Sequence, residues 1–127
     1  MSISSLSFCI VDDDLSFGKS LKRLLNARGI AADYFGSAQS FLDCVPPEQP
    51  GYAIVDLHMP ICNGLGLLCK MQEMRYTMPV IIITGQAQAD ARDLAMQQGA
   101  LGYLQKPFSG ESLLELVTKH EANSSIQ

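Results

Sequence analysis

The chain has 127 residues, a length that suits one compact domain and is too short for two. Hydrophobic residues make up 47% of it, enough for the domain to form its own core. Its formal charge is −4, from 13 acidic and 9 basic residues without a dense basic run, which argues against direct binding of nucleic acid or of an anionic membrane by this domain. The four cysteines and two histidines form no zinc-binding pattern, and the N-terminal segment lacks the basic and apolar regions of a signal peptide. These features favour a reduced, cytoplasmic protein.

Short apolar runs alternate along the chain with amphipathic stretches. The apolar runs predict strands over residues 6–11, 31–34, 52–55, 80–83 and 102–104. The amphipathic stretches predict helices over residues 15–27, 38–44, 64–74, 87–97 and 110–120. Residues 122–127 are expected to be a polar tail that frays or marks a truncated end.

This alternation of strands and helices is typical of an α/β domain. Parallel strands need a crossover between them, and the helices of the predicted βαβ units provide it. The run over residues 80–83, VIII, has no polar alternation, as expected for a parallel strand that is buried on both faces. The sequence therefore predicts one doubly wound parallel sheet with helices on both sides.

Four of the five predicted strands lead directly into polar or charged residues. These are Asp12, Asp13 and Asp14 after the first strand, Asp56 after the third, Thr84 after the fourth, and Lys106 near the end of the fifth. Functional groups of open α/β sheets collect at the carboxyl ends of the strands, so we expect these side chains to form one site. Asp14 is expected to cap the first helix instead, because it directly precedes that helix.

The predicted site concentrates negative charge. Two carboxylates about 4 Å apart repel each other by roughly 4 kcal/mol at an effective dielectric constant near 20, so several acids together require a cation or raised pKa values. Lys106 supplies one positive charge, and a divalent ion with oxygen ligands, Mg²⁺ or Mn²⁺, would supply the rest. With the Thr84 hydroxyl as a neutral donor, the site suits phosphoryl transfer to an aspartate nucleophile.

Taken together, these residues resemble the site of a response-regulator receiver domain from two-component signalling, and the resemblance covers about residues 6–120. The segments DLHMP at 56–60, ITG at 83–85 and QKPF at 105–108 further resemble receivers of LuxR-type transcription regulators. The resemblance implies a flavodoxin-like fold, with five parallel strands in the order 2-1-3-4-5 and five helices. It places the receiver domain over residues 1–121.

The resemblance also implies a metal site and a phosphoacceptor. Asp13 and Asp56 would bind Mg²⁺ (or Mn²⁺) directly, Asp12 would act mainly through water, and the backbone carbonyl of His58 would be a further ligand. Asp56 would accept a phosphoryl group from a sensor histidine kinase.

Further roles are implied for residues around the phosphoacceptor. Lys106 and Thr84 would hold the phosphoryl oxygens, and the peptide bond before Pro107 would be cis. When Thr84 moves to bond the phosphoryl group, Tyr103 would turn inward as the switch aromatic and reshape the face formed by the fourth helix, fifth strand and fifth helix.

The implied protein is a switch that assists its own phosphorylation and dephosphorylation, and not an enzyme with multiple turnover. The reshaped face would control an output domain or a partner and thereby regulate transcription. The same face would also form a phosphorylation-driven homodimer. A LuxR-type output domain would be a helix-turn-helix DNA binder that follows the tail. No membrane partner is expected.

Two alternative functions remain open at this point. A small phosphatase of the haloacid-dehalogenase type would use Asp12 as its nucleophile with Asp14 two residues further on, but it would leave Asp56 without a role and normally needs a longer chain. A degenerate receiver that only binds other proteins would lack one of the strand-end residues, and none is missing.

Overall fold

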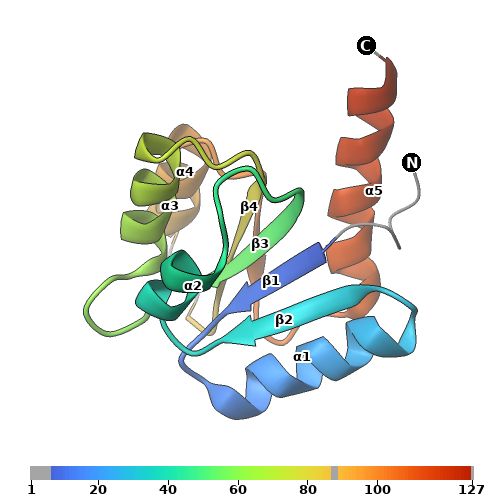
Figure 1. The fold of residues 1–127 in the computed structure, drawn as a ribbon, viewed down its shortest axis with the longest axis horizontal. Coiled ribbons are helices and arrows are strands. Elements are labelled where there is room, and N and C mark those ends of the chain that lie inside the picture. Colours follow the sequence, from blue (N-terminus) through green and yellow to red (C-terminus); the bar gives the residue numbers. More distant parts are fainter. Residues whose placement is uncertain (1–6, 87–88, 127) are drawn as a thin grey trace.

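The computed structural model describes residues 7–86 and 89–126, in which five strands alternate with five helices (Figure 1). The strands are β1 (Ser7–Val11), β2 (Ala31–Phe35), β3 (Gly51–Asp56), β4 (Val80–Thr84) and β5 (Gly102–Gln105). The helices are α1 (Leu15–Ala27), α2 (Ala38–Cys44), α3 (Gly64–Glu73), α4 (Ala89–Gln97) and α5 (Gly110–Ile126). No helix in the described ranges is both long enough and apolar enough to cross a membrane.

All five strands are parallel and lie in the order β2-β1-β3-β4-β5, which confirms the predicted fold class and strand order. The register places Val11 opposite Val55, and Asp56 opposite Ile83. Because the strands run in the same direction, the residues that follow β1, β3, β4 and β5 meet at one edge of the sheet. This edge carries the candidate site.

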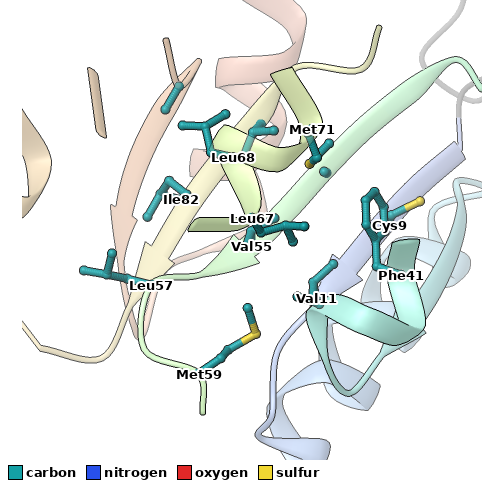
Figure 2. Close-up of a cluster of buried hydrophobic side chains, with 14 of the residues drawn as sticks. Cys9, Val11, Phe41, Val55, Leu57, Met59, Leu67, Leu68, Met71 and Ile82 are labelled. Atoms are coloured by element: carbon teal, nitrogen blue, oxygen red, sulfur yellow. The ribbon is translucent and has the colours of Figure 1, made fainter. Parts of the chain in front are cut away.

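The helices bury the sheet on both faces, with α2, α3 and α4 on one side and α1 and α5 on the other (Figure 1). The core on the first side contains Phe41 of α2 and Leu67 of α3, which pack with Val55 and Ile82 of the sheet (Figure 2). The core on the second side is built in the same way from α1, α5 and the opposite side chains of the strands. Burial on both faces explains the unbroken apolar run of β4.

The predicted element bounds agree with the structure to within one residue, wherever both can be compared, except at the end of α5. Leu6 and Ala87, where a strand and a helix were predicted to begin, lie outside the described residues. The predicted helix end at His120 is wrong, because α5 continues to Ile126. The sequence after His120 contains no glycine or proline that would stop a helix.

A contact from the sheet also holds this part of α5. The Tyr52 hydroxyl at the start of β3 donates a hydrogen bond to the Glu121 carboxylate and lies 2.8 Å from Nδ1 of His120. Tyr52 is 1% exposed, so this hydroxyl needs partners inside the protein. The end of α5 is therefore packed against β3 by a polar cluster as well as by apolar contacts.

Candidate functional site

The sheet edge brings together the polar residues that the sequence singled out. Asp12 and Thr84 are fully buried, and Asp56 is 5% exposed. Oxygen atoms of Asp12, Asp13 and Asp56 lie within 4.8 Å of one another. Lys106 reaches the same group, with its Nζ 2.7 Å from Oδ2 of Asp12 and 3.8 Å from Oδ1 of Asp56.

Asp12 is fixed by several hydrogen bonds. Its Oδ2 accepts the bond from Lys106, and its Oδ1 accepts a bond of 2.9 Å from the backbone N–H of Asp14. Asp14 in turn caps α1, since its Oδ1 accepts from the N–H of Phe17 at 3.1 Å. The predicted cap is confirmed, and it directs Asp14 to the helix and away from the acid role of the phosphatase alternative.

Asp56 is positioned by the tight path of the chain after β3. The N–H of Leu57 donates to the carbonyl of Ile83 at 2.7 Å, and the N–H of Gly64 donates to the carbonyl of Leu57 at 3.0 Å. A Cβ atom on Gly64 would lie 2.6 Å from the backbone oxygen of Asp56. Only glycine lets α3 begin this close to the strand end, so Gly64 helps to fix the place of Asp56.

The environment of Asp56 disfavours its negative charge. Burial is the largest cause, the nearby Asp12 carboxylate is the next, and together they raise the pKa of Asp56 to about 6 from its ordinary value of 3.8. Lys106 and a backbone hydrogen bond from His58 act in the opposite direction. A further cation would relieve this cost, and three clustered carboxylates are the oxygen donors that Mg²⁺ prefers. The residues present therefore fit the implied metal.

The Thr84 hydroxyl lies in a local turn with Gln86. Its Oγ1 donates to the Gln86 carbonyl at 3.2 Å and accepts from the Gln86 N–H at 3.1 Å. A hydroxyl hydrogen rotates to suit its acceptor, so the donated bond can be redirected to another acceptor.

Lys106 is held from two directions. Its backbone N–H donates to the carbonyl of Thr84 at 2.7 Å, and the peptide bond to Pro107 is cis, as expected. Its Nζ lies 4.2 Å from the centre of the Phe17 ring, which contacts Phe108 edge-on at 5.8 Å between ring centres. The two phenylalanines were not predicted to belong to the site, although Phe108 lies in the QKPF segment at residues 105–108.

Tyr103 lies on β5, opposite Ile82, and packs against the core beneath α2, α3 and α4. Its ring is half-buried, but its hydroxyl oxygen is fully buried and has no hydrogen-bond partner within the described ranges. A buried hydroxyl without a hydrogen-bond partner lowers folding stability, so this position of the Tyr103 side chain carries an energetic cost.

A second tyrosine, which was not predicted to belong to the site, contacts the acidic residues directly. The Tyr34 hydroxyl donates to the backbone carbonyl of Asp12 at 2.6 Å. Burial, and then the charges of Asp12, Asp13 and Asp14, raise the pKa of Tyr34, so the hydroxyl remains a donor. No local sequence signal links Tyr34 to this site, because the contact joins β2 to the residue that follows β1.

Known proteins have sequences similar to that of this chain. A model of the response regulator receiver domain matches residues 8–118. The DNA-binding transcriptional regulator NtrC of Klebsiella pneumoniae is 37% identical over 110 residues, which cover 87% of this chain and 24% of NtrC. The transcriptional regulatory protein FixJ of Bradyrhizobium diazoefficiens is 33% identical over 108 residues, 85% of this chain and 53% of FixJ. The chain thus spans about a quarter to a half of these relatives.

Solved structures agree in fold. The crystal structure of FixJ-N matches with a TM-score of 0.82 and 32% identity, covering 89% of this chain and 90% of that one. A response regulator protein from Burkholderia pseudomallei, solved with a phosphorylated aspartic acid, a calcium ion and citrate, matches with a TM-score of 0.80 and 26% identity, covering 95% and 74%. None of these similarities favours the haloacid-dehalogenase alternative. On the family match and the fold, the chain belongs to the response regulator receiver domains.

Proposed function

We propose that this chain accepts a phosphoryl group on Asp56 from the phosphohistidine of a sensor histidine kinase, in a Mg²⁺-dependent reaction. The observation that carries the proposal is the position of the Asp56 carboxylate, at the sheet edge, within 4.8 Å of two other carboxylates and 3.8 Å from the Lys106 ammonium. The phosphorylated aspartic acid and calcium ion of the Burkholderia pseudomallei relative support the same chemistry.

The proposed metal ligands are the carboxylates of Asp13 and Asp56, with Asp12 acting mainly through water and the backbone carbonyl of His58 as a further ligand. A bound Mg²⁺ or Mn²⁺ would offset the negative charge of the carboxylates and of the incoming phosphoryl group. The lysine alone leaves the three acids with a net negative charge.

In the proposed transfer, an oxygen of ionised Asp56 attacks the phosphorus atom and forms an acyl phosphate. The bond between phosphorus and the kinase histidine nitrogen breaks, and its electron pair returns to the imidazole ring. Lys106 is placed to stabilise the negative charge of the transferred phosphoryl group. Its Nζ already lies near both Asp12 and Asp56 and can donate a hydrogen bond to a phosphoryl oxygen from there.

The proposed switch begins at Thr84. Its hydroxyl would give up its bonds to the Gln86 carbonyl and N–H, and the side chain would move so that the hydroxyl donates to a phosphoryl oxygen. Tyr103, whose buried hydroxyl has no partner in the described chain, would then move into the space that Thr84 leaves. This movement would change the face formed by α4, β5 and α5, and a nearly complete shift needs about 5.5 kcal/mol of differential interaction.

The changed face would control an output domain or a partner and thereby regulate transcription. NtrC and FixJ are transcriptional regulators longer than this chain, which supports an output domain in the same protein. A LuxR-type helix-turn-helix domain and a phosphorylation-driven homodimer through the same face are parts of the proposal. The domain would act as a switch, taking up one phosphoryl group without multiple turnover.

Intact-mass measurement after incubation with acetyl phosphate and Mg²⁺ tests the proposal. We expect one phosphoryl adduct per chain, none for Asp56→Asn, and an unchanged adduct for Asp33→Asn, which alters an exposed aspartate on β2. A wild-type chain without an adduct, or an Asp56→Asn chain with one, would contradict the proposal. Steady release of phosphate that depends on Asp12 would instead support the phosphatase alternative.

Analytical ultracentrifugation with and without beryllofluoride tests the homodimer. Beryllofluoride mimics the phosphoryl group on the aspartate, so we expect it to increase the sedimentation coefficient. A monomer at high protein concentration under both conditions would exclude this part of the proposal.

A further inference from the structure

The Asp12–Asp13 peptide group is fastened to the edge strand β2. The backbone N–H of Asp12 donates to the carbonyl of Phe35 at 3.1 Å, which extends the pairing of β1 and β2 by one hydrogen bond. The carbonyl of Asp12, which belongs to the peptide that joins it to Asp13, accepts the hydroxyl of Tyr34 at 2.6 Å. A side chain of β2 thus fixes the orientation of the peptide between the two acids.

The Tyr34 ring packs directly against Gly18 of α1. A Cβ atom on the buried Gly18 would lie 2.1 Å from Cε1 and 2.3 Å from Cδ1 of the ring, so any larger residue would displace it. Glycine weakens a helix relative to alanine, and the close contact with the ring accounts for glycine in α1. This contact with Gly18 holds the ring in the position from which the Tyr34 hydroxyl donates to the Asp12 carbonyl.

Asp13 depends on this arrangement more than Asp12 does. The carboxylate of Asp12 is held by Lys106 and by the N–H of Asp14. The side chain of Asp13 is exposed, and nothing within residues 7–86 and 89–126 hydrogen-bonds its carboxylate. Its direction is therefore set chiefly by the backbone that Tyr34 holds.

We propose that Tyr34 is a positioning residue for the acidic pair, whose ring rests on Gly18 and whose hydroxyl orients the Asp12–Asp13 peptide for divalent cation binding. The inference rests on the proposed function, since it assigns Tyr34 to the metal site of that function. Residues that hydrogen-bond to metal ligands, without binding the metal themselves, strongly affect metal affinity. A ligand that is already held in place loses less conformational freedom when the ion binds.

Titration calorimetry with MgCl₂ tests the inference without any phosphoryl transfer. Tyr34→Phe removes only the hydroxyl, and we expect it to weaken Mg²⁺ binding about tenfold. In phosphorylation by acetyl phosphate, the Mg²⁺ concentration for half-maximal rate should rise by the same factor, while the rate at saturating Mg²⁺ changes little. A purely structural tyrosine would affect folding stability and leave the Mg²⁺ dependence as it is.

Tyr76→Phe is the matched control. The Tyr76 hydroxyl also donates to a backbone carbonyl at 2.6 Å, that of Val45, at the end of α2. The control loses the same kind of hydrogen bond away from the acids, so it should lower folding stability and keep wild-type Mg²⁺ affinity. Equal effects of the two variants on Mg²⁺ affinity would overturn the inference.

Gly18→Ala provides an independent variant, because it displaces the ring and keeps the hydroxyl. We expect it to weaken Mg²⁺ binding too, and to have a smaller effect in the Tyr34→Phe background, since both changes disturb one contact. Additive effects, or wild-type affinity in Tyr34→Phe, would overturn the positioning role alone. Failure of the wild-type chain to bind Mg²⁺ or to be phosphorylated would overturn the proposed function as well.

Discussion

The Lys106 ammonium is hydrogen-bonded at 2.7 Å to the carboxylate of Asp12, a side chain with no exposed surface. Its distance to Asp56, the proposed acceptor, is longer at 3.8 Å. In this arrangement the lysine chiefly compensates a buried charge. It therefore contributes to folding as well as to the proposed binding of the phosphoryl group.

Replacing Lys106 with methionine should reveal this contribution. We expect Lys106→Met to lower the free energy of unfolding in EDTA by about 3 kcal/mol, because removal of one partner leaves a buried charge without compensation. Urea denaturation measures the loss, and added Mg²⁺ should recover part of it. Lys119→Met is the control, since Lys119 is exposed and its pair with Glu115 is worth about 0.5 kcal/mol at most. Equal losses for the two variants would contradict the assigned role.

The raised pKa of Asp56 predicts a pH-dependent cost of folding in the metal-free protein. Below about pH 3 the carboxyl is protonated in both the folded and the unfolded chain and costs nothing. Between about pH 4 and pH 6 the unfolded chain ionises first, so stability falls as the pH rises through the folded pKa of about 6. Above that pH the cost is about 3 kcal/mol, from roughly 1.4 kcal/mol for each pKa unit.

Asp56→Asn removes this cost. In EDTA we expect the variant to be more stable than the wild type by about 3 kcal/mol at pH 7.5, and the difference to vanish near about pH 3. Urea denaturation across this pH range measures it, with Asp33→Asn, at an exposed position, as the control. A gain that does not change with pH would show that the pKa of Asp56 is not the cause. Added Mg²⁺ should reduce the gain, because the ion stabilises the ionised form of the wild type.

The strand-end residues of the site were predictable because parallel strands place their carboxyl ends at one edge. Asp12, Asp56 and Thr84 each terminate or directly follow a short apolar run that can be read in the sequence. No further tertiary information is needed to bring them together once the strands are known to be parallel.

The contacts that orient these residues could not be predicted in the same way. Tyr34 and Asp12 are 22 positions apart and meet only because β2 lies beside β1. The Phe17 ring contacts Lys106 across most of the chain. Periodicity and capping rules describe neighbours along the chain, and these contacts join distant segments.

Tyr103 should be replaceable by phenylalanine with a gain in stability. Its hydroxyl is buried without a partner among the described residues, and removing such a group recovers its desolvation cost, about 1 kcal/mol or more. We expect urea denaturation to show a higher free energy of unfolding for Tyr103→Phe. Tyr76→Phe, which loses a paired hydroxyl, should show a lower one. A loss of stability in Tyr103→Phe would mean that the hydroxyl is bonded in solution.

Tyr52→Phe should loosen the end of α5 without affecting the phosphoacceptor. The Tyr52 hydroxyl bonds both His120 and the Glu121 carboxylate, so its removal should lower the free energy of unfolding by about 1–2 kcal/mol. Hydrogen exchange should become faster in the last turns of α5, while β4 keeps its protection. Phosphorylation by acetyl phosphate should be unchanged, because Tyr52 lies near the start of β3 and Asp56 at its end.

Tyr76→Phe again separates a local from a general effect. It should lower stability by a similar amount and leave the relative exchange rate of α5 as in the wild type, because Tyr76 bonds the carbonyl of Val45 on the opposite side of the sheet. If both variants loosen α5 equally, the helix end responds to overall stability, and the contact with Tyr52 has no special role. If only Tyr52→Phe loosens it, this hydroxyl is what holds the end of α5 against β3.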